Sequence, residues 1–316
     1  MTEPLVSETL PTWPFTILIL FFGACWGSFL NVLIYRIPED MSVTWERSKC
    51  TRCHTMIPWY ENIPILSYLI LLGRCSRCNE RIDAQYPLIE MIGVLWAYAL
   101  AKSQLLPLLQ DPVAWLASPS PLWEALGVWL WLQLFVFALV VIIFIDLRYT
   151  FIPDEVSLTV SILGVVGAVM IPQIDIIDTL VGGAMGGALL LGVRWVGALM
   201  FQREAMGLGD VKLLMMIGIF CGWRVLPIIL FASAIQGILA ALVAQLYTRL
   251  SGQQNALTLT TSELDERFGE LPNDRDDSEP MRIAIPFGPF LALSAFEVIM
   301  LGKDRVIEMW LFTLTG

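Results

Sequence analysis

Two aspartates in an otherwise apolar sequence are the first candidates for chemistry. Asp146 closes the run VVIIFIDLRY, and Asp210 follows Gly207 and Gly209 in AMGLGDVKLL, where another apolar run begins. A carboxylate at the edge of hydrocarbon is costly, so a membrane chain usually pairs it or uses it. Two close carboxylates share one proton and can act as general base and general acid on an attacking water. Asp146 and Asp210 therefore predict aspartyl protease chemistry, and the two glycines let an extended peptide approach the backbone closely.

Other residues compete poorly with these aspartates as catalytic groups. Asp154 follows Pro153 at a predicted helix start, where the helix dipole favours a carboxylate, so it has a structural explanation. The only histidine is His54, which leaves a Ser-His-Asp or Cys-His site without a nearby base. Lys212 belongs to the predicted active-site loop with Gly207 and Gly209, but no serine is placed to form a Ser-Lys pair with it.

Four cysteines have the spacing of a metal site. Cys50 and Cys53 form one C-x-x-C pair, and Cys75 and Cys78 form a second pair after 21 intervening residues. Two such pairs can supply four thiolates to one tetrahedral zinc ion, and a site with four protein ligands is structural because no position stays open for water. Disulfides are the alternative, which a reducing cytoplasmic location disfavours. His54, next to Cys53, is an alternative ligand.

The elements that must position these groups are predicted membrane helices. The 316 residues are 57% hydrophobic with a mean hydropathy of +0.70, which is far from the composition of a soluble globular domain. The apolar stretches predict an all-α polytopic membrane protein with about eight transmembrane helices and a small cytoplasmic zinc-binding insertion after the first. The predicted spans are 14–36, 86–105, 122–145, 155–172, 178–201, 211–221, 225–247 and 287–312, of which the sixth is short.

This pattern divides the chain into five predicted parts. Residues 1–36 form an extracytoplasmic N-terminus and the first span, and 37–85 form the four-cysteine loop. Residues 86–249 form the peptidase core in the membrane, 250–282 form an acidic flexible cytoplasmic loop, and 283–316 hold the last span.

The distribution of Lys and Arg predicts the orientation in the membrane, because cytoplasmic loops are enriched in both. With the 37–85 loop in the cytoplasm, 15 of the 19 basic residues lie on the cytoplasmic side. The four others are Lys102, Arg224, Lys303 and Arg305. Both Asp146 and Asp210 then lie at the cytoplasmic face.

The net charge of −10 has a local source. The segment Ser262–Pro280 holds eight acidic and two basic residues. Its low hydrophobicity and its charge run predict a solvated flexible tether. The alternative is attraction of a basic partner segment.

Several motifs, in their order along the chain, resemble the type IV prepilin peptidases, the bifunctional leader peptidase and N-methyltransferase family of bacterial inner membranes. They are GSFLNVLIYRIP, the paired C-x-x-C with WYENIPILSYL between them, YPLIE, IDLRYTFIPDEVSL, EAMGLGDVKLL and IPFGPFLAL. The resemblance covers nearly the whole chain. It places the catalytic pair of that family on Asp146 and Asp210, the pair that the residues themselves indicate.

The resemblance implies a reaction, a location and partners. Prepilin or pseudopilin precursors would lose a short basic leader after a glycine, at the cytoplasmic face of the bacterial inner membrane. The new N-terminus would then be methylated with S-adenosylmethionine as the donor. The implied partners are these precursors and the lipid bilayer, with no nucleic acid. The sequence assigns no residue to the methyl donor, because no Gly-rich loop follows a strand and opens a helix.

Three other functions compete with this one. A presenilin-like intramembrane aspartyl protease also uses a G-x-G-D helix, but its Pro-Ala-Leu segment is absent here. A proton-coupled transporter would place its carboxylates near the middle of the bilayer rather than at span ends. A zinc-dependent scaffold without catalysis predicts replaceable aspartates. Glu297, inside the last span, is expected to pack as a protonated group rather than to serve the reaction.

Overall fold

The computed structural model describes residues 12–45, 47–109, 118, 120–201, 207–251 and 286–315. These residues form helices, and among them there is no β-strand beyond two isolated bridges. The acidic loop predicted at 250–282 lies outside the described residues from 252 onward. The chain divides into two compact units, 1–223 and 224–316, and each is described by itself.

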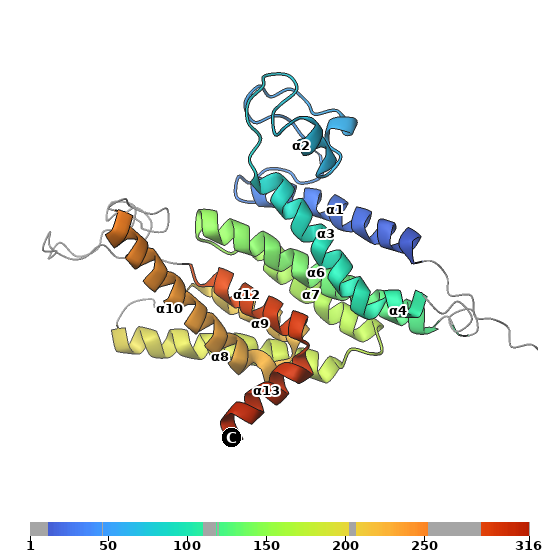
Figure 1. Cartoon of the computed structure of the whole chain (residues 1–316). Helices are drawn as coiled ribbons and strands as arrows, with labels where there is room; N and C mark the ends of the chain where they lie inside the picture. Colours follow the sequence, from blue (N-terminus) through green and yellow to red (C-terminus); the bar gives the residue numbers. More distant parts are fainter. Residues whose placement is uncertain are drawn as a thin grey trace, which may run out of the picture. The chain divides into compact units, whose positions relative to one another are not determined.

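The first unit holds the four-cysteine loop and most of the helices (Figure 1). Its long helices are α1 (Trp13–Arg36), α3 (Gln85–Gln104), α6 (Ser120–Tyr149), α7 (Asp154–Met170), α8 (Ile176–Phe201) and α9 (Leu208–Cys221). Its short helices are η1 (Trp59–Glu61), α2 (Leu66–Ile70) and α4 (Leu106–Leu109). The first six predicted spans thus all correspond to helices.

Length and hydropathy qualify four helical segments of the described chain as membrane spans. They are Trp13–Arg36, Pro121–Tyr149, Ile176–Met200 and Trp223–Tyr247. Helices α7 and α9 are shorter, with 17 and 14 residues, and a perpendicular crossing takes about 20. The protein is therefore an all-helical membrane protein, and the count of eight spans stays a prediction.

Glycines let two helix pairs of this unit approach closely. A Cβ atom at Gly27 of α1 would lie 2.5 Å from the Cα atom of Glu90 in α3. A Cβ atom at Gly182 of α8 would lie 2.1 Å from the carbonyl oxygen of Gly218 in α9. Backbones that touch in this way are typical of membrane helix pairs, where van der Waals packing supplies much of the association energy. The short helix α9 is thereby held against α8.

The relative directions of helices α6, α7 and α9 follow from contacts between them. The Trp131 indole of α6 donates a hydrogen bond of 2.9 Å to the carbonyl oxygen of Gly164 in α7, beyond the short turn that joins the two helices. A Cβ atom at Gly164 would in turn lie 2.6 Å from the ring of Phe220, near the end of α9. At the other end of α7, Asp154 meets Lys212, near the start of α9. Helices α7 and α9 are therefore parallel, and α6 is antiparallel to both.

The second unit contains α10 (Leu226–Ser251), α12 (Gly288–Leu301) and α13 (Lys303–Thr315). The prediction of one continuous span at 287–312 is wrong, because the helix stops at Gly302. Gly302 adopts a φ of +84° and a ψ of 129°, a backbone conformation that residues with a side chain rarely adopt and that glycine tolerates best. The three residues after Gly302 are all charged (Lys303, Asp304 and Arg305), which suits the start of a separate helix.

Glu297 lies in α12 of the second unit. The Gln236 side-chain amide of α10 donates to both carboxyl oxygens of Glu297, at 3.0 Å each. This contact joins two helices, and Glu297 is exposed. The expectation that Glu297 packs as a protonated group stays a prediction.

Candidate active site and four-cysteine loop

Asp146 lies in the last turn of α6, with 5% of its surface exposed. It follows Phe135 by eleven residues, or about three helical turns, so the two side chains share one face of the helix. The Phe135 ring stacks on Phe220 of α9, with ring centroids 4.5 Å apart. Asp146 therefore lies on the face of α6 that contacts Phe220 near the end of α9.

Asp210 lies in the first turn of α9 and is half-buried. It precedes Phe220 by ten residues, and Asp146 follows Phe135 by eleven, so each aspartate lies roughly 15 to 17 Å along its helix from the stacked rings. Because α6 and α9 are antiparallel, both carboxylates lie at the same end of the layer. The fold thus brings two residues that are 64 positions apart in the chain to the same end of these helices and to a similar height along them.

The glycines before Asp210 fit this arrangement sterically. A Cβ atom at Gly209 would lie 3.0 Å from Cβ of Ile152, in the turn between α6 and α7. The start of α9 can therefore approach that turn more closely than a larger residue would allow. Gly207 has an ordinary extended conformation, with φ −69° and ψ 149°, and is exposed. Its contribution is open space beside Asp210 rather than an unusual backbone angle.

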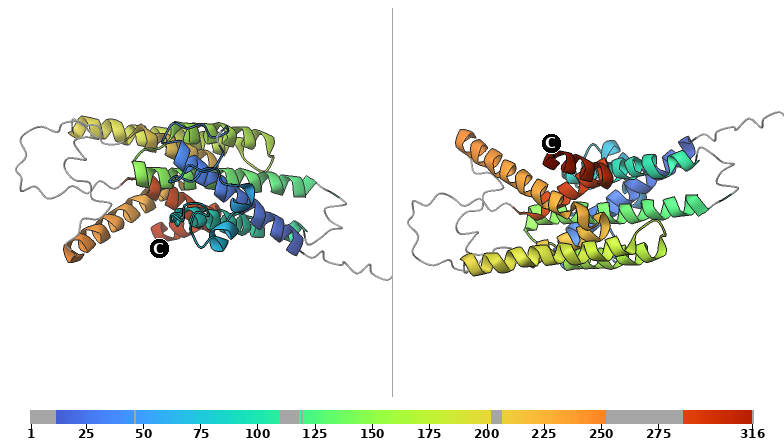
Figure 2. Two further views of the ribbon diagram at one scale, coloured as in Figure 1. Left: turned by 90° about the horizontal axis from the view of Figure 1, so that it is seen from above. Right: turned by 90° about the horizontal axis from the view of Figure 1, so that it is seen from below.

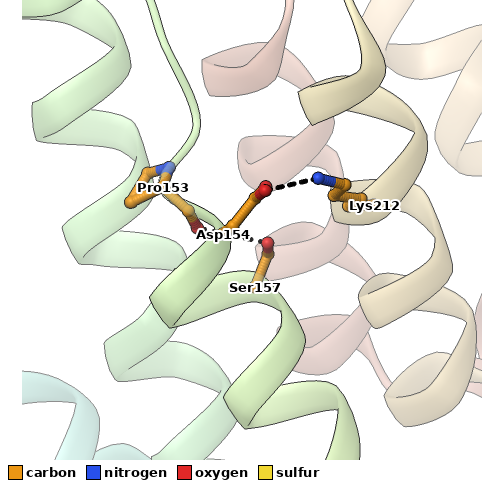
Figure 3. Close-up of polar contacts among 4 residues, drawn as sticks. All are labelled: Pro153, Asp154, Ser157 and Lys212. Atoms are coloured by element: carbon orange, nitrogen blue, oxygen red, sulfur yellow. Dashed lines mark hydrogen bonds and ion pairs between the residues drawn. The ribbon is translucent and has the colours of Figure 1, made fainter.

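Lys212 has a partner that sequence reasoning missed. Its Nζ atom lies 2.5 Å from Oδ2 of Asp154, so the first turns of α7 and α9 are joined by an ion pair (Figure 3). The side chains are 29% and 53% exposed, respectively. Asp154 was expected only to favour its own helix start. The signal for the pair was the presence of opposite charges at the starts of two helices, but their parallel packing could not be read from the sequence.

The four cysteines of the predicted metal site come together. The ligand atoms of Cys50, Cys53, Cys75 and Cys78 all lie within 4.8 Å of one another. None of them forms a disulfide. The Cys50 and Cys78 sulfurs are 3.8 Å apart, close to the separation of about 3.8 Å between two sulfurs that sit 2.3 Å from one tetrahedral zinc ion. The donor set and its geometry therefore fit zinc.

Each cysteine pair is held by the same backbone turn. The Cys50 N–H donates to the Thr55 carbonyl at 3.0 Å, and the Cys75 N–H donates to the Glu80 carbonyl at 2.9 Å. The residue after each pair is left-handed, with φ 55° at His54 and 60° at Asn79. His54 therefore occupies the turn position that Asn79 occupies in the other pair. It is not among the clustered ligands, so the alternative of a histidine ligand is not supported.

Hydrogen bonds within these turns favour the thiolate form, which a metal needs, at Cys53 and Cys75. At Cys78 the N–H of Glu80 lowers the pKa, but burial and the thiols of Cys75, Cys53 and Cys50 outweigh it and raise the pKa to about 11. Bonds from the Thr55 hydroxyl and N–H lower the pKa of the Cys53 thiol to about 6. Bonds from the N–H groups of Cys78 and Arg77 lower the pKa of the Cys75 thiol. A donor to sulfur stabilises the charged form, which is the form that binds zinc.

A buried carboxylate fastens this loop to the membrane helices. Glu90 of α3 is 8% exposed, and its Oε2 atom accepts a 2.7 Å hydrogen bond from the N–H of Ile65. Ile65 has a φ of +62°, which is strained for a β-branched residue. The Asn31 amide of α1 donates to the Tyr86 carbonyl of α3 at 3.1 Å nearby. Sequence reasoning missed Glu90, although an acidic residue inside an apolar run was the available signal.

Comparisons with known proteins match both halves of the chain. Residues 21–103 match the Bacterial Peptidase A24 N-terminal domain, and residues 133–242 match the Type IV leader peptidase family. The first match covers the four-cysteine loop with α1 and α3. The second covers Asp146 and Asp210.

Curated relatives align over almost their full length. A Myxococcus xanthus protein named prepilin leader peptidase/N-methyltransferase is 31% identical, over 96% of this chain and 95% of its own. Proteins of the same name from Dichelobacter nodosus and Pseudomonas aeruginosa are 30% and 29% identical, over 95% and 94% of this chain and 96% and 93% of their own. No solved structure matches.

Proposed function

Since the chain belongs to the type IV leader peptidase family, we propose that it removes the short basic leader of prepilin-like precursors as a membrane aspartyl endopeptidase. The observation that carries the proposal is the placement of Asp146 and Asp210 at the same end of antiparallel helices. Curated relatives named prepilin leader peptidase/N-methyltransferase support the substrate class over a presenilin-like protease, a transporter or a scaffold.

In the proposed reaction the two aspartates share one proton. The ionised carboxylate accepts a proton from water as the water oxygen attacks the carbonyl carbon of the scissile bond. The protonated carboxyl group donates its proton to the carbonyl oxygen. Collapse of the tetrahedral intermediate breaks the C–N bond, and the amide nitrogen takes a proton from the dyad as it leaves. A hydroxyl group of the intermediate gives its proton to the other carboxylate as the new carboxyl group forms, so the dyad returns to its singly protonated state.

The ion pair of Lys212 and Asp154 has a positioning role in this proposal. It fixes the first turn of α9, which carries Asp210, against the first turn of α7. Gly207 and Gly209 leave the backbone beside Asp210 open to an extended peptide. All these groups lie at the end of α6 that the charge distribution assigns to the cytoplasm.

The four cysteines are proposed to hold one zinc ion through Cys50, Cys53, Cys75 and Cys78. Such an ion would fix the two turns relative to each other, and four thiolates leave no position for a reacting water. The loop would then be a rigid cytoplasmic platform joined to α3 through Glu90.

N-methylation of the new N-terminus is the second proposed activity, with S-adenosylmethionine as donor. It is supported by the names of the relatives. No residue is assigned to the donor. The proposed location is the bacterial inner membrane, with precursors and the bilayer as partners.

One experiment tests both activities. The protein is co-expressed with a pilin-like precursor, and intact-mass spectrometry is run on the product. Loss of the leader together with the mass of one methyl group is the expected result. An unprocessed precursor beside correctly inserted protein would refute the peptidase assignment, and a cleaved product without the methyl group would refute the second activity alone.

A further inference from the structure

A groove of about 480 Å³ runs along α6, between α1 and α7. In both views of Figure 2 α1 runs obliquely across α6, and the side chains that line the groove come from α1, from the loop after it, from α6 and from α7. Representative lining side chains are Trp26 and Leu33 of α1, Phe137 and Val141 of α6, and Val156 and Leu163 of α7.

The groove is apolar along its length and acidic at one end. Its only ionisable lining residues are Asp40, just after α1, and Glu155, in the first turn of α7. Both are exposed. The end of α1 and the start of α7 lie at the level of the last turn of α6, which carries Asp146. The acidic mouth of the groove is therefore at the same end of α6 as the two aspartates.

We propose that this groove docks the apolar segment of the membrane-anchored precursor, with the cationic residues of its leader beside Asp40 and Glu155. The inference rests on the proposed function and names the surface that presents the substrate. An apolar helix that lays one face into an apolar groove is a common mode of peptide recognition. The charge at the mouth selects this occupant, because two carboxylates attract a cationic segment and repel an anionic lipid headgroup.

The groove is separate from the catalytic face. Asp146 shares its face of α6 with Phe135, against which α9 packs, whereas the groove floor uses Leu134, Phe137 and Val141. The turn between Tyr149 and Asp154 joins α6 to α7 at this mouth, and Ile152 of the turn lies against Gly209 at the start of α9. The junction of the docked apolar segment and the leader, which holds the scissile bond, would then lie at the groove mouth beside this turn.

The first test uses a photocrosslinking amino acid in the full chain, reconstituted in lipid vesicles with a precursor. Thr159 of α7 lines the groove, and Leu158 lies beside it at the same depth, exposed but outside the lining. A crosslinker at position 159 is expected to capture the apolar segment of the precursor several times more efficiently than one at position 158. Equal capture at both positions, or capture of lipid alone at position 159, would overturn the proposal.

The second test reverses the charge at the mouth. Glu155→Lys is expected to lower the rate of cleavage of a precursor with a basic leader roughly tenfold. It should restore much of that rate for a precursor whose leader cations are replaced by Glu. Glu39→Lys is the matched control, because Glu39 is exposed near Asp40 but does not line the groove. Equal effects of Glu155→Lys on both leaders would contradict the inference.

The outcomes distinguish a failure of the docking proposal from a failure of the proposed peptidase function. If the unmodified chain does not cleave the precursor, the proposed function fails. If it cleaves normally while position 159 captures no precursor and Glu155→Lys shows no dependence on leader charge, the docking groove alone is wrong.

Discussion

At the scale of single residues, the side chains of the proposed active site differ in how strongly their replacement should reduce cleavage. Asp146 and Asp210 are proposed to exchange a proton with water and substrate, which requires a carboxyl group at each position. Lys212 and Asp154 contact each other, and their proposed contribution is to hold α9 in place. The two pairs therefore lead to different expectations for the same kind of substitution.

Asp146→Asn and Asp210→Asn are each expected to lower leader cleavage by about a hundredfold or more, because an amide cannot accept or return a proton. The double variant should be scarcely worse than either single variant, since the two groups act as one unit. Cleavage kinetics on a purified precursor measure this, with membrane insertion as the control. Methylation of a pre-cleaved precursor should survive. Small and additive losses would show that the dyad assignment is wrong.

Asp154→Asn and Lys212→Met are expected to be mild by comparison. An ion pair exposed to this degree contributes about 0–1 kcal/mol, which corresponds to less than about a tenfold loss of activity. In a double-mutant cycle the combined variant should lose no more than the worse single variant. If Lys212→Met abolished cleavage while Asp154→Asn did not, Lys212 would have a role other than this pair.

At the scale of elements, the four-cysteine loop and the start of α9 are the parts that the site depends on. Each is a short segment without a large core of its own. The loop relies on its two backbone turns and on the bond from Ile65 to Glu90. Helix α9 relies on close glycine packing against α8.

We expect one zinc ion per chain in purified protein, measured by elemental analysis. Replacing all four clustered cysteines by serine should abolish zinc binding and make residues 37–85 sensitive to protease, because the metal supplies stability that a loop of this size lacks. Cys25→Ser is the matched control, since Cys25 lies in α1, outside the cluster. Retention of zinc by the four-serine variant would refute the site.

At the scale of the whole molecule, orientation in the membrane decides whether the aspartates can meet a cytoplasmic leader. The charge distribution predicts that the N-terminus and the 102–121 region are extracytoplasmic and that 37–85 and 250–282 are cytoplasmic. In the described residues, α1 and α3 are antiparallel neighbours with the four-cysteine loop between them. Of these two helices, α1 is among the segments that length and hydropathy qualify as spans, and a crossing by α3 stays a prediction.

Labelling of single cysteines with a membrane-impermeant reagent in intact cells tests the orientation. A cysteine introduced at Ser103 should be labelled from the outside, and one introduced at Ser42, which is exposed and outside the cysteine cluster, should be labelled only after the cells are opened. Labelling at position 42 in intact cells would reverse the orientation and place the proposed active site on the wrong side. The same scan, extended to each loop, counts the spans.

The sequence by itself determined the helical class of this protein and predicted its chemistry. Carboxylates at the ends of apolar runs, paired C-x-x-C motifs and hydropathy are local properties, so Asp146, Asp210 and the four cysteines could be predicted without knowing what they contact. The site residues as a catalytic set stay a prediction, whereas the clustering of the cysteines is confirmed. The last span was mispredicted as one helix because the hydropathy pattern outweighed the stop signal at Gly302.

Only the tertiary structure decided how these parts align. The antiparallel packing of α6 and α9 brings Asp146 and Asp210 to one end, and it depends on contacts such as Phe135 with Phe220, 85 positions apart in the chain. The bond from Ile65 to Glu90, the ion pair of Lys212 with Asp154 and the groove on α6 likewise join separate helices or loops. A residue pattern fixes which face of a helix is apolar, but the partner of that face depends on helix directions and close approaches that arise only when the whole chain packs.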